Sequence, residues 1–134
     1  MFVDSSAIVA ILTAAPSAAA LADALEKARA PITSPLAIVE AIQGLRRLRH
    51  SSVAEAQADV VEFLTIAGVQ TVAISARETD AAADAMARYG VGTGHPAQLN
   101  LADCLAYAVA RNYRAPLLSA DARFSLTDAK TSPV

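Results

Sequence analysis

The amino-acid sequence predicts an α/β fold with a mainly parallel sheet and helices on both of its faces. Short apolar or β-branched runs alternate along the chain with longer segments that carry helix-start signals. The connections between these segments are short, which is typical of strand–helix–strand units. The chain has 134 residues, of which 54% are hydrophobic, so we expect one domain over residues 1–134 with a core of its own.

The first half of the chain is expected to form two strands and four helices. Asp4 or Ser5 is suited to cap the first helix, because short polar side chains accept hydrogen bonds from the free N–H groups at a helix start. Pro16 begins a second helix, and Ser52 with Glu55 forms a capping box. The expected strands are 1–3 and 31–33, and the expected helices are 5–13, 16–29, 34–50 and 51–68.

The second half of the chain continues this alternation. Ser75 with Glu78 is another capping box, and Asn100 with Asp103 has the same spacing before an alanine-rich helix. A loop with two glycines and a proline separates these two helices. The expected elements are a strand at 70–74, helices at 78–90 and 100–112, a strand at 115–119, and in the tail 122–134 one helical turn and a last edge strand.

Composition and charge exclude several classes of protein. The net charge is −2, which does not indicate a general nucleic-acid binder, although a local basic patch is compatible with it. Cys104 is the single cysteine, so an internal disulfide and a cysteine-based zinc site are excluded. The start has no signal-peptide pattern and no apolar run is long enough to cross a bilayer. We therefore expect a cytoplasmic protein with no membrane partner.

Four acidic side chains fall where an α/β fold builds its functional site. Asp4 and Asp121 directly follow predicted strands, and sites in such folds form outside the carboxyl ends of strands. Asp103 lies in the first turn of a helix, and Glu40 lies at the margin of the apolar face of helix 34–50. Taken singly, the three aspartates are explained as helix caps or a turn residue. Glu40 stays open between an exposed residue on the rim of the apolar face and a functional carboxylate, because an ionised carboxylate that faces a core is costly unless it is paired or bound to a cation.

Taken together, the four carboxylates predict a metal site. They would repel one another, and their pKa values would rise, unless a cation lay among them. Hard oxygen ligands suit Mg²⁺ or Mn²⁺ rather than zinc. No nucleophile and no histidine base accompany them, so the pattern favours metal-assisted hydrolysis of a phosphodiester.

The segments that carry these acids resemble the four acidic blocks of PIN-domain ribonucleases, and most of all those of VapC-type toxins of bacterial toxin–antitoxin pairs. They cover nearly the whole chain in order and read MFVDSSAIVAIL, SPLAIVEAI, LNLADCLAYAVA and APLLSADARF. The resemblance implies a PIN-like three-layer α/β/α sandwich with a mainly parallel central sheet. It also implies an endoribonuclease that requires Mg²⁺ or Mn²⁺.

The resemblance also implies a role for each matching residue. The catalytic, metal-binding acids would be Asp4, Glu40, Asp103 and Asp121. Ser6 matches a hydroxyl residue that supports the site by hydrogen bonding, and Asn100 matches the asparagine of the third block, for which we expect a supporting or structural role.

The fourth block departs from the pattern of many close toxins, which carry G-[N/D]-D-F. Here the aligned stretch is ADARF, with Arg123 directly before Phe124. Asp128 is therefore an alternative for the fourth acid. Asp121 is favoured because it directly follows a predicted strand.

The expected partners are RNA, a cognate antitoxin and a second copy of the chain. RNA phosphates are candidates to bind the basic group Arg46, Arg47 and Arg49, although cations also suit a solvated helix end. The antitoxin and a homodimer follow from the resemblance alone. Which RNA is cut, and whether one or two metal ions bind, stay open.

Two other functions compete with this interpretation. The first is a PIN-like binding module without catalysis, in which the acids serve folding or partner contact. The second is a phosphoacceptor domain of receiver type. That function is disfavoured because a single aspartate, Asp4, follows the first strand, and the middle strand ends at Ser75.

Overall fold

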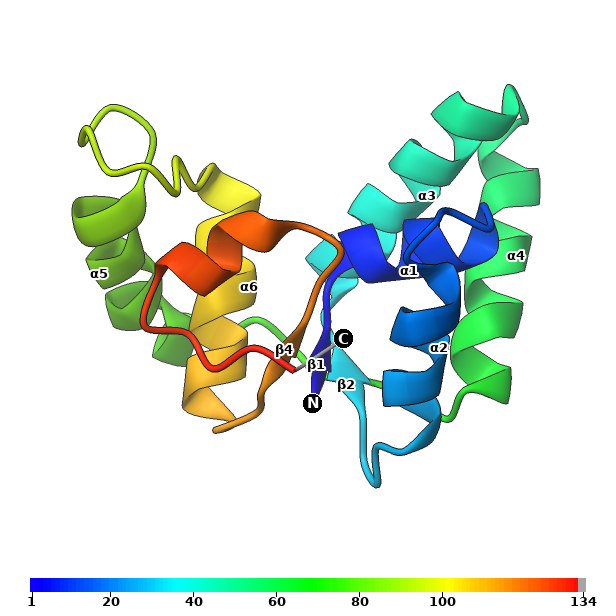
Figure 1. The fold of residues 1–134 in the computed structure, drawn as a ribbon, viewed down its shortest axis with the longest axis horizontal. Coiled ribbons are helices and arrows are strands. Elements are labelled where there is room, and N and C mark those ends of the chain that lie inside the picture. Colours follow the sequence, from blue (N-terminus) through cyan, green and yellow to red (C-terminus); the bar gives the residue numbers. More distant parts are fainter. Residues whose placement is uncertain (133–134) are drawn as a thin grey trace.

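A four-stranded parallel sheet forms the middle layer of the computed structural model, which describes residues 1–132 (Figure 1). The strand order is β3-β2-β1-β4, and every pairing between these strands is parallel. Phe2 of β1 is in register with Ile32 of β2 on one side and with Leu117 of β4 on the other. The strands are β1 (Phe2–Val3), β2 (Ile32–Thr33), β3 (Gln70–Thr71) and β4 (Leu117–Leu118).

Helices cover both faces of this sheet, as the sequence predicts. Successive residues of a strand point to opposite faces, and β1 and β4 each bury both of their residues. Phe2 and Leu117 belong to one buried cluster, with residues of α5 (Thr79–Tyr89) and α6 (Leu101–Asn112).

Val3 and Leu118 belong to a second buried cluster on the opposite face of the sheet. In Figure 1, α5 and α6 lie on one side of the strands and the other four helices lie on the opposite side, so the expected three-layer α/β/α arrangement is confirmed. The helices of this second layer are α1 (Ser5–Leu12), α2 (Ala18–Glu26), α3 (Pro35–Arg49) and α4 (Val53–Ile66).

The helix starts follow the capping residues of the sequence. Side-chain oxygens of Asp4, Ser34, Ser52 and Asn100 accept backbone N–H groups in the first turns of α1, α3, α4 and α6. The capping box of Ser75 and Glu78 is also present, but it opens a short 3₁₀ helix, η1 (Ala76–Glu78), from which α5 continues. The helix predicted from residue 16 begins later, at Ala18.

All four strands are shorter than the sequence predicts, β1 and β2 by one residue each and β3 and β4 by three residues each. The strand expected at 70–74 ends at Thr71, and only the N–H of Val72 still reaches the β2 carbonyl of Thr33, at 2.8 Å. The reason is that Ser34 turns the chain into α3, which leaves the following residues of the edge strand without a partner. The strand expected at 115–119 spans Leu117–Leu118, because the N–H of Ala115 bonds back to the last turn of α6.

The tail holds the predicted helical turn and an isolated bridge in place of a full edge strand. The turn is the 3₁₀ helix η2 (Ala122–Leu126), and Thr131 forms a parallel bridge with Leu117. Residues 133–134 of the expected tail lie outside the described residues. Within residues 1–132, none of the helices is both long and apolar enough to cross a membrane.

Phe124 anchors η2 in the core, and its removal tests how firmly this segment is held. Its side chain is fully buried, whereas Leu126 of the same helix is 51% exposed. We expect Phe124→Ala to lower the free energy of unfolding by about 3–5 kcal/mol, because it leaves a cavity. Leu126→Ala is the matched control and should change it by less than about 0.5 kcal/mol. Urea unfolding of both variants measures the difference, and equal effects would contradict the anchoring role.

Candidate active site

The pairing of β1 with β4 places two chain segments side by side at the carboxyl edge of the sheet. Val3 is in register with Leu118, and the N–H of Asp4 donates to the carbonyl of Leu118 at 3.0 Å. Asp4, which caps α1, and Ser119, which begins the segment that leads to η2, are the first residues after each strand and lie side by side. This is the edge at which open α/β sheets bind ligands.

Asp4 is buried, with 4% of its surface exposed. One carboxylate oxygen, Oδ2, accepts the hydroxyl of Ser6 at 2.6 Å, the N–H of Ser6 at 3.2 Å and the hydroxyl of Ser119 at 3.3 Å. Burial raises the pKa of the Asp4 carboxyl, the nearby Asp103 carboxylate raises it further, and the bonds from Ser6 and Ser119 partly oppose this. The ionised form of Asp4 is thus disfavoured by burial and by the neighbouring carboxylate, and a nearby positive charge would stabilise it.

Ser6 links the start of α1 to the segment that follows β4 through hydrogen bonds. Besides its bond to Asp4, its hydroxyl oxygen accepts the N–H of Ala120 at 3.0 Å and lies 2.9 Å from the hydroxyl of Ser119. The sequence predicts a supporting role for Ser6 but gives no prediction for Ser119. The signal that would have found Ser119 is its position directly after β4, equivalent to that of Asp4 after β1.

Glu40 lies on α3 and is half-buried. Its Oε1 accepts the hydroxyl of Ser5 at 3.3 Å. Burial raises the pKa of the Glu40 carboxyl, and repulsion from Asp4 and then from Asp103 raises it further. Carboxylates repel one another appreciably only at short range. Asp4, Glu40 and Asp103 are therefore close enough for their charges to interact.

Asp103 is held by the capping box at the start of α6. Its Oδ2 accepts the N–H of Asn100 at 3.0 Å, and its own N–H donates to Oδ1 of Asn100 at 2.8 Å. Asn100 therefore caps the helix and fixes the orientation of Asp103 at the same time. The same Oδ2 also accepts Nη2 of Arg123 at 3.0 Å.

Asp121 reaches the site together with Arg123. Its Oδ1 accepts the backbone N–H of Arg123 at 2.9 Å, and its Oδ2 accepts Nε at 2.7 Å and Nη2 at 2.5 Å. These bonds hold the pKa of the Asp121 carboxyl below its usual range, although partial burial opposes them. From the sequence, Arg123 is only a departure from the pattern of the fourth block, and its contacts with both aspartates are not predicted.

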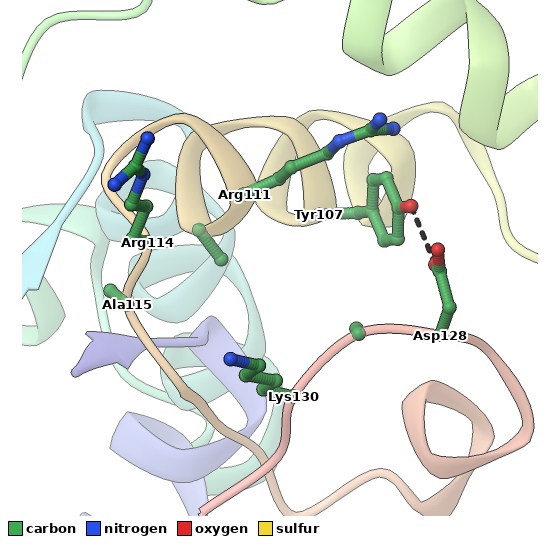
Figure 2. Close-up of a pocket in the computed structure, with 8 residues that line it drawn as sticks. Tyr107, Arg111, Arg114, Ala115, Asp128 and Lys130 are labelled. Carbon is green, nitrogen blue, oxygen red and sulfur yellow. Dashed lines mark hydrogen bonds between the residues drawn. The ribbon is translucent and has the colours of Figure 1, made fainter.

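Asp128, the alternative fourth acid, lies elsewhere. It accepts the hydroxyl of Tyr107 at 2.6 Å and pairs with Arg88 at 3.3 Å. Figure 2 shows it beside a pocket of about 260 Å³ whose other charged lining residues are Arg111, Arg114 and Lys130. Burial and the bond to Asp128 raise the pKa of Tyr107 to about 12. Asp128 is thus engaged with Tyr107 and Arg88, whereas Asp121 shares Arg123 with Asp103. This favours Asp121 as the fourth acid of the site.

The three candidate RNA-binding arginines lie in the last turn of α3. Arg49 pairs with Asp59 at 2.7 Å and also donates to the carbonyl of Leu12. Arg47 is exposed and follows Glu40 by seven residues, so both lie on the same side of the helix, about 10 Å apart along its axis. Arg46 is half-buried. Arg47 is therefore the arginine best placed to serve the site.

Three of the acids keep an oxygen available for a cation. No hydrogen bond within residues 1–132 uses Oδ1 of Asp4, Oε2 of Glu40 or Oδ1 of Asp103. We call these atoms the open oxygens. Carboxylate oxygens are the donors that Mg²⁺ and Mn²⁺ prefer, so the donor set fits such an ion. As placed, no three acidic, histidine or cysteine side chains in the described part of the chain form a closed metal site, so an ion would require them to turn toward one another.

The burial of Asp4 predicts a gain in stability when its charge is removed. The pKa of Asp4 is higher in the folded chain than in the unfolded chain. At pH values between these two pKa values, the folded chain therefore binds more protons than the unfolded chain. The stability of the wild-type protein therefore falls as the pH rises through that window. Asn caps a helix as well as Asp does, and Asp4→Asn should raise the free energy of unfolding at pH 7.

Urea unfolding with EDTA at a series of pH values measures this effect. The advantage of Asp4→Asn should shrink as the pH falls and disappear below the pKa of an unfolded aspartate, because both side chains are then neutral. A variant less stable than wild type at pH 7 would contradict the assignment of Asp4 as a desolvated charge.

Comparisons with known proteins agree with this fold. The PIN domain family model matches residues 1–130. A VapC ribonuclease of Rhizobium meliloti is 39% identical over 138 residues, covering 95% of this chain and 97% of the relative. Ribonuclease VapC42 of Mycobacterium tuberculosis is 37% identical over 128 residues, covering 96% of this chain and 95% of the relative.

A solved structure supports the fold independently. The crystal structure of Mycobacterium tuberculosis VapC20, described as a sarcin–ricin loop cleaving toxin, aligns with a TM-score of 0.72. The alignment covers 96% of this chain and 95% of the other at 19% identity. The predicted PIN-like fold is therefore confirmed, and the chain belongs to the PIN-domain family and, within it, to the VapC ribonucleases.

Proposed function

We propose that this VapC ribonuclease is a Mg²⁺- or Mn²⁺-dependent endoribonuclease that hydrolyses RNA phosphodiester bonds and acts as the toxin of a toxin–antitoxin pair. The observation that carries the metal dependence is the set of open oxygens on Asp4, Glu40 and Asp103. The relatives described above bear ribonuclease names, and nothing in them favours a binding module without catalysis.

One group of residues would bind the cation, and a second group orients the side chains that bind it. Asp4, Glu40 and Asp103 would hold the ion through their open oxygens. Hydrogen bonds from Ser6 and Ser119 occupy the other oxygen of Asp4, and Ser5 occupies one oxygen of Glu40. A divalent ion, when bound, makes water a better nucleophile and stabilises the charge on the attacked phosphate.

The buried charges of the site favour cation binding. Burial raises the pKa values of Asp4 and Glu40. Repulsion from Asp103 raises both further, and repulsion from Asp4 adds to that of Glu40. A nearby cation removes both penalties. Ligand carboxylates must be deprotonated, so the affinity for the ion should increase with pH over the range in which these groups ionise. The site is therefore less stable without an ion than with one.

RNA, an antitoxin and a second copy of the chain are the proposed partners. The exposed guanidinium of Arg47, on the same side of α3 as Glu40, supports a phosphate contact beside the site. The antitoxin and the homodimer rest on membership of the VapC group. The ends of the cleavage products would identify the RNA target.

Loss of one open oxygen should abolish cleavage. Purified protein freed of antitoxin is incubated with total RNA and Mg²⁺, Mn²⁺ or EDTA. We expect discrete products that require the metal. Asp103→Asn and Asp4→Asn should each reduce the rate more than about a hundredfold, since even changes outside the ligand shell often cost 10–100-fold.

Asp80→Asn is the matched control, because Asp80 is an exposed acid on α5. It should cut RNA at the wild-type rate. Cleavage by Asp4→Asn at the wild-type rate, or cleavage that persists in EDTA, would refute the assigned site.

The salt dependence of RNA binding tests Arg47. Each phosphate contact to single-stranded RNA contributes about 0.7 to the slope of log affinity against log salt concentration. In EDTA, where cleavage is blocked, Arg47→Gln should reduce the slope by about that amount. Arg49→Gln is the control and should change it less, because Asp59 already pairs with Arg49. Equal slopes for wild type and Arg47→Gln would leave Arg47 as an ordinary solvated side chain.

A further inference from the structure

Arg123 lies between two of the four acids of the site. Its Nη2 is 3.0 Å from Oδ2 of Asp103 and 2.5 Å from Oδ2 of Asp121. Its Nε donates to Asp121 at 2.7 Å, and its Nη1 donates to the carbonyl of Gln98 at 2.9 Å. The guanidinium therefore joins η2, the start of α6 and the loop before α6.

Asp121 differs from the other three acids in that Arg123 uses both of its carboxylate oxygens. Oδ1 accepts the backbone N–H of Arg123, and Oδ2 accepts two side-chain bonds from the same residue. Asp4, Glu40 and Asp103 each keep an open oxygen. Three of the four acids therefore keep a carboxylate oxygen that could bind a metal ion. In the fourth, Asp121, both oxygens accept hydrogen bonds from Arg123.

We propose that Arg123 is a built-in cation that occupies the Asp103–Asp121 half of the acidic cluster. One divalent ion then binds to the open oxygens of Asp4, Glu40 and Asp103. Asp121 is not a metal ligand and acts by positioning Arg123. This inference rests on the proposed function, since it concerns the same metal site.

The guanidinium is suited to this position because it is planar and always charged. It donates in a fork that matches carboxylate geometry, and it does not lose its proton in proteins. A second divalent ion on the same side would have to break these bonds and lie next to a fixed positive charge. Arg123 therefore limits the site to one ion.

Arg123 also positions the shared acid, Asp103. Nη2 of Arg123 and the N–H of Asn100 both bond to Oδ2 of Asp103, so Oδ1 is the atom left for an ion. The segment that carries Arg123 is itself held in place. Phe124 is fully buried, and the N–H of Asp121 donates to the hydroxyl of Ser119 at 2.9 Å.

The number of Mn²⁺ ions bound per chain, measured by isothermal titration calorimetry without RNA, tests the proposal. The wild-type protein should bind one ion. Arg123→Gln frees Asp121 and Oδ2 of Asp103, and should bind two. Arg88→Gln is the matched control, because Arg88 pairs with Asp84 and Asp128 outside the site, and it should bind one.

Asp121→Asn provides a second arm that does not depend on the folding of Arg123→Gln. It should still bind one ion, and its loss of Mn²⁺ affinity should be at least about tenfold smaller than that of Asp103→Asn, which removes a ligand. Arg123→Lys keeps the charge and should bind one ion. Circular dichroism and thermal unfolding establish that each variant is folded.

The outcomes separate this inference from the proposed function. Two ions or none on the wild-type protein, an unchanged count in folded Arg123→Gln, or equal affinity losses for Asp121→Asn and Asp103→Asn would overturn the role of Arg123. Metal-dependent cleavage by the wild-type protein would still uphold the proposed function in each of these cases. One bound ion without any RNA cleavage would instead overturn the proposed function and leave the assignment of Arg123 intact.

Discussion

The pairing of the first strand with the last one is the constraint on which the rest of the structure depends. β1 is hydrogen-bonded between β2 and β4, and its residues supply both buried clusters. The same pairing ends at the bond from the N–H of Asp4 to the carbonyl of Leu118. Fold and site therefore share one register, because a shift of one residue would turn the core residues of β1 to the wrong faces and separate Asp4 from Ser119.

The site is built from charges that the fold alone does not favour. Asp4 is buried, and Glu40 and Asp103 repel it. Serine hydroxyls offset part of this cost for Asp4, and Arg123 offsets it for Asp121. The remaining unfavourable charge is concentrated on the three acids with an open oxygen. The same buried carboxylates therefore lower the stability of the fold and favour the binding of a cation. A functional site can in this way gain affinity for its ligand at some cost in stability.

Local chemistry made much of this arrangement predictable, and contacts between distant segments explain what was missed. Asp4, Ser34 and Asn100 cap helices because their side chains meet N–H groups two or three residues away, which spacing alone reveals. The length of β3 depends on where β2 ends, which no pattern within residues 70–74 contains. Arg123 bonds to Asp103 twenty residues earlier in the chain, so its role required the three-dimensional structure.

The distance along the chain between Asp4 and Ser119 has a consequence for synthesis. The two side chains are bonded although 115 residues separate them, and a ribosome makes the N-terminal part first. A nascent chain that already contains Asp4, Glu40 and the first four helices still lacks β4, which pairs with β1 on the side opposite to β2. The ribonuclease site is therefore completed only once β4 and Ser119 have been synthesised, long after Asp4 and Glu40.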